Sequence, residues 1–305
     1  RGTYRYNGSA WVFDGTMIEQ AAPNLILQSN ALTATWAQNS ISSTQNVTGP
    51  LGANTAWTLT DASAVATSSI TQGIAALTAA NYTFSAYAKK TTGAQSAYPI
   101  LYANSVIGLR IAVVTLDTSN GTATVWTAYT GFTVTTTTAT VDDCGDFWRL
   151  RVTFLADTDA VGWVFGVIPA GTANTAQTTG VTDATLTGSN VFTAIQVELG
   201  SSATSYIATG AASATRAADI PTAPTSGLLV NAQGFAAMKF RTITEQAFGN
   251  FLSTFDGATG GVPLMNIAGA LPMQLGVYDN TTLLGFGAST TFANPSVGTV
   301  NSVAT

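Results

Sequence analysis

The residues best suited to chemistry in this chain are five aspartates in a short stretch. Asp142, Asp143 and Asp146 lie close together, and Asp157 and Asp159 follow the next candidate strand. Two carboxylates held about 5 to 9 Å apart can hydrolyse a glycosidic bond, and ligands that are all oxygen suit calcium. Asp also favours turns. The first three aspartates are therefore candidates for a calcium site or a hydrolytic pair, and the alternative interpretation is a set of solvated turns.

The chain lacks the residues that other classes of catalytic site require. The chain contains no histidine, which excludes Ser-His-Asp and Cys-His nucleophiles and the usual zinc sites. No Gly-x-x-x-x-Gly-Lys loop cradles a phosphate, and no Gly-x-Gly-x-x-Gly joins a strand to a helix. We therefore expect no enzyme activity and no cofactor other than calcium.

Several aromatic residues lie near expected turns or alternate with threonine. A sugar ring stacks on a flat aromatic face, and the alternative role of such residues is core packing or subunit contact. The candidates for ligand contact are Trp57, Tyr98, Tyr102, Trp126 and Tyr129. Aromatics at regular strand spacing are expected in the core, and these are Trp36, Trp148 and Trp163.

The composition predicts an all-β protein. Hydrophobic residues make up 46% of the 305 residues, but charged residues only 8%, against about 25% in ordinary globular domains. Thr, Ser, Asn and Gln must then keep the surface polar. Thr suits a pleated strand, and the scarcity of charge removes the ion pairs that support exposed helices.

Charge, cysteine content and hydropathy exclude several kinds of interaction and cross-link. The net charge is −5 with no basic cluster, so nucleic acid is not expected as a partner. Cys144 is the single cysteine, which allows no intrachain disulfide and is expected to be a buried thiol. The longest apolar runs, such as 111–114, fall far short of the ~20 residues that span a bilayer, so membrane insertion is not expected.

Alternating apolar residues predict a succession of strands from residue 24 onward. In 148–154 the apolar side chains occupy every second position, which is typical of a half-buried strand. The run 109–116 is more continuously apolar and is expected to be central. A turn at 117–122 precedes a return strand at 124–129, and the threonine tract 133–140 is expected to be an edge strand or loop. Regular strands with turns between them favour a jelly-roll β-sandwich.

The run 194–219 joins a strand, a turn and a tether. Ile195, Val197 and Leu199 alternate with polar residues, which predicts a half-buried strand. Tyr206 and Ile207 are expected to pin the following segment to the body of the domain. Residues 210–226 read as a linker stiffened by two prolines.

The domain organisation follows from these boundaries. Residues 1–22 are expected to form an N-terminal β-hairpin that turns at an Asn-Gly pair, and residues 23–209 the jelly-roll sandwich. After the linker, residues 227–305 are expected to form a second β-sandwich, too short to be complete.

The run 194–219 resembles the end of a β-sandwich module found in virion proteins of tailed phages. The matching pieces are 196–199 (Gln-Val-Glu-Leu), 204–209 (Thr-Ser-Tyr-Ile-Ala-Thr) and 215–219 (Thr-Arg-Ala-Ala-Asp). Ala208 stands where such modules usually carry proline. The segment 24–30 with Trp36 resembles the opening strand, and 84–89 and 146–150 resemble inner strands. The second domain resembles the first half of a concanavalin-like or laminin-G-like sandwich.

The resemblance implies a virion component such as a tail fibre, spike or head fibre, located on the phage particle. It implies other virion proteins and host-surface glycans as partners, and a homo-oligomer, commonly a trimer. A depolymerase spike fragment that uses the paired aspartates remains an alternative, as does a secreted bacterial adhesin or carbohydrate-binding module.

Overall fold

The computed structural model describes residues 2–6, 9–16, 19–91, 98–107, 109–158, 161–173, 176–177 and 185–219. Beyond these it describes the strands between Leu229 and Ala304. The chain divides into two compact units, Arg1–Pro221 and Thr222–Thr305. The described residues contain strands and turns but no helix, so the predicted all-β class is confirmed, and they hold no helix that could cross a membrane.

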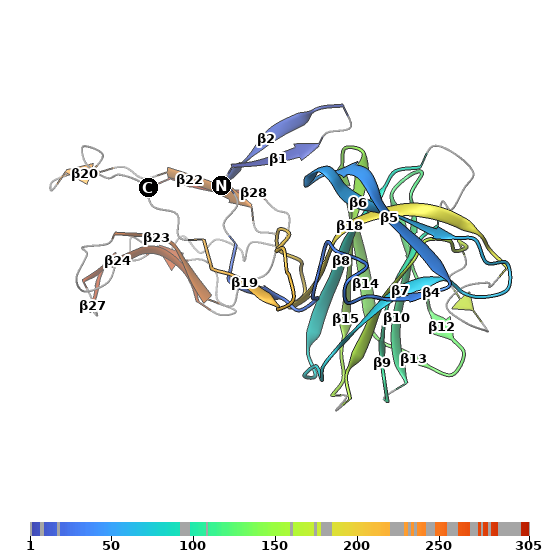
Figure 1. Ribbon diagram of the computed structural model, residues 1–305. Helices are drawn as coiled ribbons and strands as arrows, with labels where there is room; N and C mark the ends of the chain where they lie inside the picture. The colour runs from blue at the N-terminus through green and yellow to red at the C-terminus, as the bar shows by residue number, and fades with distance from the viewer. Residues whose placement is uncertain are drawn as a thin grey trace. The chain divides into compact units, whose positions relative to one another are not determined.

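Two sheets form the sandwich of the first unit (Figure 1). The seven-stranded sheet has the order β11-β10-β9-β16-β7-β4, with β13 added parallel to β10. Its strands are β4 Ala37–Asn39, β7 Ser69–Ile74, β9 Ile100–Ser105, β10 Arg110–Asp117, β11 Thr122–Val125, β13 Thr133–Val134 and β16 Trp163–Ile168.

The six-stranded sheet has the order β14-β15-β8-β18-β6-β5, and all its strands are antiparallel to their neighbours. Its strands are β5 Ile41–Gly49, β6 Gly52–Asp61, β8 Asn81–Lys89, β14 Thr137–Cys144, β15 Phe147–Leu155 and β18 Gly188–Leu199. Successive strands such as β4 and β5, β6 and β7, and β8 and β9 lie in different sheets, so the chain crosses repeatedly from one sheet to the other.

The remaining strands form small pairs. In the first unit they are the hairpin β1 Gly2–Tyr6 with β2 Trp11–Thr16, the pair β3 Ala22–Asn24 with β19 Ala214–Arg216, and the parallel pair β12 Ala128–Tyr129 with β17 Ala176–Gln177. The hairpin expected near the start of the chain is thus present, although Asn7 and Gly8 lie outside the described residues.

The second unit consists of antiparallel sheets of two or three strands. Its strands are β20 Leu229–Val230, β21 Gln233–Gly234, β22 Ala237–Arg241, β23 Phe248–Thr254, β24 Val262–Ala268, β25 Gln274–Leu275, β26 Val277–Asp279, β27 Thr282–Gly285 and β28 Val300–Ala304. The expected likeness of this unit to concanavalin or laminin-G domains stays a prediction.

The sandwich core lies between the two sheets. Aromatic rings form its centre: Phe84 and Phe165 meet edge to face at 5.3 Å, and Phe154 lies 5.1 Å from Trp163. All four are 0% exposed. Of the tryptophans expected in the core, Trp36 and Trp163 are buried, and Trp148 is partly buried against the cluster.

The opening segment is a shorter strand than the sequence predicts. β3 ends at Asn24, and residues 25–36 are irregular although Ile26 is fully buried. Side chains satisfy the backbone here in place of a ladder: Leu27 N donates to Gln72 Oε1 at 2.6 Å, and Gln72 Nε2 donates to Leu27 O at 2.9 Å. Long-range side-chain bonds of this kind leave no periodic signal in the sequence.

The outer face of the seven-stranded sheet carries a second, smaller core. The return strand β11 ends at Val125, earlier than predicted, and the chain then folds over β9 and β10. Trp126 is 0% exposed and its indole donates to Thr115 Oγ1 at 2.7 Å. Because both faces of β10 are covered, its run 111–116 is buried throughout, although β10 is the second strand from the edge of the sheet and not the central strand predicted.

Gly166 on β16 makes room for the ring of Tyr102, its neighbour across the strands. A Cβ at position 166 would lie 2.1 Å from that ring, whereas a Cβ at Gly73 on the adjacent strand β7 would meet nothing within 4 Å. We expect Gly166→Ala to lower the free energy of unfolding by about 1 to 3 kcal/mol through overpacking. Gly73→Ala should change it little, and equal urea midpoints for the two variants would contradict the assignment.

Candidate functional site

Glu198 on β18 is a carboxylate that the fold buries completely. Residues 200–209, which we call the strap, cross the outer face of the six-stranded sheet and supply its partners. Thr204 donates twice to it, from its backbone N to Oε2 at 2.9 Å and from its hydroxyl to Oε1 at 2.5 Å. The amide of Gln196 donates to Oε2 as well. These donors replace the water that a carboxylate loses on burial.

Gln196 holds the second half of the strap. It is 0% exposed, and its Oε1 accepts a hydrogen bond from the backbone N of Ile207 at 2.6 Å. Arg149 on β15 donates to the carbonyl of Thr204, and its guanidinium lies 5.4 Å from the ring centroid of Tyr87. The outer face of β18 is therefore buried, unlike the half-buried strand predicted, because the strap covers it.

Glu19 connects the strap to the start of the sandwich. Its Oε1 accepts from the backbone N of Ser205 and its Oε2 from the Ser205 hydroxyl, both at 2.5 Å. Arg216 Nη1 donates to the same Oε2 at 3.0 Å, and the side chain of Glu19 is only 2% exposed. An ion pair this deeply buried needs such additional donors to offset its desolvation.

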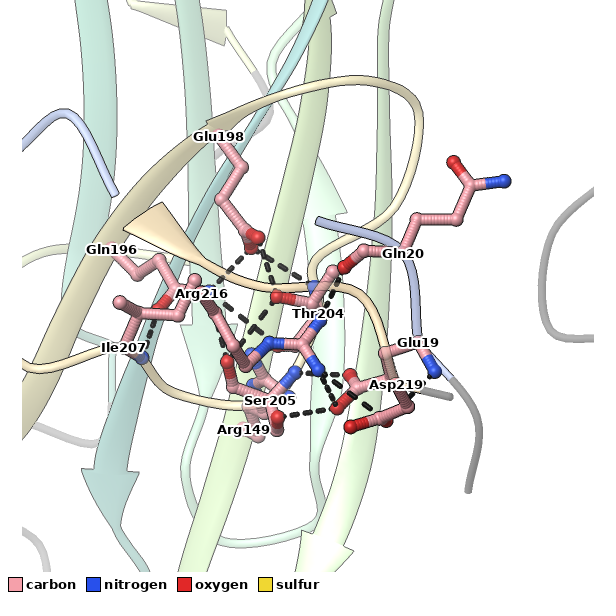
Figure 2. Close-up of polar contacts among 10 residues, drawn as sticks. All are labelled: Glu19, Gln20, Arg149, Gln196, Glu198, Thr204, Ser205, Ile207, Arg216 and Asp219. Carbon is pink, nitrogen blue, oxygen red and sulfur yellow. Dashed lines mark hydrogen bonds and ion pairs between the residues drawn. The ribbon is translucent and has the colours of Figure 1, made fainter. Parts of the chain in front are cut away.

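The incoming and outgoing segments of the sandwich lie side by side (Figure 2). Ala22 pairs with Arg216 in the β3–β19 ladder. Beyond the ladder, Glu19 N donates to Asp219 Oδ2 and Asp219 N donates to Glu19 O, each at 2.9 Å. We call this network the clasp; its members are Glu19, Arg149, Gln196, Glu198, Thr204, Ser205, Arg216 and Asp219.

Two further side chains fix the strap from the opposite end. Asn24 is 0% exposed, donates to Ile207 O at 2.8 Å and accepts from Val197 N at 3.1 Å. The hydroxyls of Tyr206 and Ser29 lie 2.6 Å apart, and burial raises the pKa of Tyr206. The prediction that Tyr206 and Ile207 pin this segment to the body is confirmed.

The donors around Glu19 and Glu198 close the module, and neither of these two carboxylates is open to a substrate. Each of the four carboxylate oxygens of Glu19 and Glu198 accepts at least one hydrogen bond from the protein. A general acid or base needs a face open to substrate, and these side chains have none. Residues 214–219, predicted as linker, are thereby part of the sandwich unit.

Three of the five aromatic ligand candidates come together in the small outer core. Tyr102 is 9% exposed, Trp126 is 0% exposed, and the rings of Trp126 and Tyr129 lie 6.3 Å apart. Burial raises the pKa of both tyrosines. The half-buried Tyr129 packs edge to face on Phe132 at 5.2 Å. These rings pack on one another, and Tyr102 and Trp126 present no open face to a sugar.

The other two candidates lie apart from this cluster. Trp57 on β6 is 7% exposed, and its indole donates to the carbonyl of Asn30 at 2.9 Å. Tyr98 is partly exposed and precedes β9. The predicted aromatic platform is therefore not assembled on one surface.

The aspartates predicted as a calcium site or hydrolytic pair have cationic partners. Asp142 and Asp143 are consecutive on β14, so their side chains leave opposite faces of the strand. Asp142 pairs with Arg151 and Asp143 with Lys90, both at 2.6 Å. Asp146 is exposed in the turn before β15.

No group of three metal-ligating side chains occurs among the described residues. Asp157 pairs with Arg110 at 2.6 Å, and Asp159 lies outside the part of the chain that the structure describes. Of the three first candidates, only Asp146 lies in a turn, whereas Asp142 and Asp143 lie on β14 as partners in ion pairs.

The sequence pointed to part of the clasp. The matching pieces 196–199, 204–209 and 215–219 supply most of its members. Glu19 was not singled out, and Asn24 was named only as the first residue of the opening segment 24–30. Their partners lie about 170 to 200 positions away in the chain, and no local pattern connects them.

Comparisons with known proteins do not identify a family for this chain. No family model and no curated protein matches the chain. Among solved structures, the enzymatically active domain of tailspike protein 4 from bacteriophage CBA120 is similar to part of it. The TM-score is 0.33 and the identity 12%, over 58% of this chain and 21% of that one. A likeness of this size fixes neither a family nor an activity.

Two matched variants can measure how much the buried ion pair between Glu19 and Arg216 contributes to stability. Arg216→Met removes the charged donor to a carboxylate that is 2% exposed. We expect a loss of about 1.5 to 3 kcal/mol in the free energy of unfolding. Arg151→Met, which breaks the more exposed pair with Asp142, should cost about 0 to 1 kcal/mol. Chemical denaturation checks both, and an equal loss in the two variants would remove the special role of the clasp.

Cys144 should react slowly with thiol reagents. Burial, with the neighbouring Asp142 carboxylate, raises the pKa of its thiol from 9.0 to about 11. Only the thiolate reacts, so at pH 8 the folded protein should react about 100-fold more slowly than the unfolded chain. The rate should keep rising up to pH 11, and a plateau near pH 9 in the folded protein would contradict this environment.

Proposed function

We propose that this chain is a non-enzymatic structural and adhesion component of a phage virion appendage. The observation that carries the proposal is the convergence of the phage-module pieces on the clasp. In the run that resembles phage modules, Gln196, Glu198 and Arg216 each hold the strap or the outgoing segment to the sandwich. The role of these three residues is then to hold the two ends of the module together.

The position of the two module ends supports this assignment. The chain arrives at residues 19–24 and leaves at residues 214–219 alongside its own start. A module whose two ends lie together can be carried within an elongated chain as a compact outgrowth. Compact modules of this kind suit a fibre or spike that projects from a particle.

The surface chemistry also supports a role in the extracellular environment of a virion. With charged residues at 8% of the chain, folding and subunit contacts depend little on ionic strength. Glycan contact, where it occurs, would have to use a surface other than the buried rings of Trp57 and Trp126.

Two measurements test the proposal. Mass spectrometry of virions purified from a phage that carries this gene should find the chain in stoichiometric amount, and its absence would contradict a virion role. Incubation of the chain with host capsular and cell-wall polysaccharides should release no new reducing ends. Release that is lost in Asp142→Asn or Asp143→Asn would establish the depolymerase alternative instead.

A further inference from the structure

The edges of the two sheets differ in how they are protected. An edge strand presents unpaired backbone groups to which another strand can add, and proteins blunt such edges by shortness, charge, proline or a covering segment. In the seven-stranded sheet, the terminal strands β4 and β11 have only three and four residues. In the six-stranded sheet, β14 carries the ion pairs of Asp142 and Asp143.

The other edge of the six-stranded sheet is β5. Its nine residues, Ile-Ser-Ser-Thr-Gln-Asn-Val-Thr-Gly, include no charged residue and no proline. β6 pairs with one side of β5, and no strand of the described residues pairs with the other. Bulges, which also blunt an edge, occur only in its second half, so the edge is neutral and open over Ile41–Gln45.

The first half of β5 is regular and firmly held. Ile41–Gln45 pair with Asp61–Trp57 without a break in register, and the bulges begin only after Gln45. The Ser68 hydroxyl lies 2.6 Å from Ser40 O and 2.7 Å from Asp61 Oδ1, so its single proton is shared between these two acceptors at the start of the strand. A strand that is already ordered loses little conformational entropy when it pairs.

A second copy of this chain is the occupant that fits this edge. Two copies of residues 41–45 paired antiparallel across a two-fold axis at Ser43 place Ser42 opposite Thr44 and Ile41 opposite Gln45, and no like charges meet. A charged partner strand would find no opposite charge on β5. Val65, 89% exposed, lies in the loop between β6 and β7, whose Ser68 bonds to Ser40, the residue before β5.

We propose that β5 is an assembly edge, at which two copies of the chain pair antiparallel through Ile41–Gln45 and join their six-stranded sheets into one. The pairing is two-fold, so each contact joins two copies of the chain through the same residues. It is independent of the virion role proposed above.

Matched lysine pairs on the two edges of the same sheet test the proposal in the full-length chain. Ser42 and Thr44 are exposed on β5, and Thr138 and Thr140 are exposed at the same spacing on β14. The variant S42K/T44K places charges on the proposed contact, and T138K/T140K places them on the opposite edge. The expected result, from sedimentation velocity over a concentration series, is half the wild-type mass for S42K/T44K and the wild-type mass for T138K/T140K.

Equal masses for wild type and S42K/T44K, each with an unchanged melting temperature, would overturn the proposal. Hydrogen exchange of the unmutated protein gives a second measurement that does not depend on the variants. The amides of residues 41–45 should exchange more slowly in concentrated than in dilute solution, and identical exchange at both concentrations would also overturn it.

Discussion

The burial of two carboxylates, Glu19 and Glu198, is the constraint on which the organisation of this unit depends. A carboxylate removed from water is tolerated only where donors surround it. The donors to Glu198 come from Thr204 and Gln196, and those to Glu19 come from Ser205 and Arg216. Each carboxylate therefore dictates where the strap and the outgoing segment must lie.

This constraint sets the position of the module ends, whereas the sandwich core fixes only the two sheets. The core is made of apolar side chains whose burial is favourable but not directional. Hydrogen bonds to buried carboxylates are directional, and a strap shifted by one residue would leave them unmet. The chain has few charged residues, and several of them lie in the clasp, where they determine the positions of the strap and the outgoing segment.

The sequence predicted those parts of the fold that local periodicity records. Alternation in 148–154 and the apolar run 109–116 predicted the two-layer sandwich, and the two runs form the strands β15 and β10. The pinning role of Tyr206 and Ile207 was also predictable, since large apolar residues in a run of small ones must find a surface. The aromatic candidates could not be sorted, because the covering of β9 and β10 by the segment after Val125 is a long-range event.

The clasp was only partly predictable for a related reason. The strand 194–199 alternates as a half-buried strand does, but the polar side chains of Gln196 and Glu198 are 0% exposed. Polar residues at alternate positions indicate an exposed face unless a covering segment is known. The strap that covers this face is held by Glu19, which lies far away in the sequence. In the opening segment, the side chains of Asn24 and Gln72 likewise accept the backbone hydrogen bonds that a longer strand would have made with a neighbouring strand.

Native-state hydrogen exchange tests most directly whether the clasp is part of the cooperative unit of the sandwich. The amides of Ser205 and Ile207, which donate to buried Glu19 and Gln196, should exchange only through global unfolding. Their opening free energy should then equal that of core amides in β8. Exchange of the strap amides through a local opening, well below the global free energy while β8 stays protected, would contradict the account.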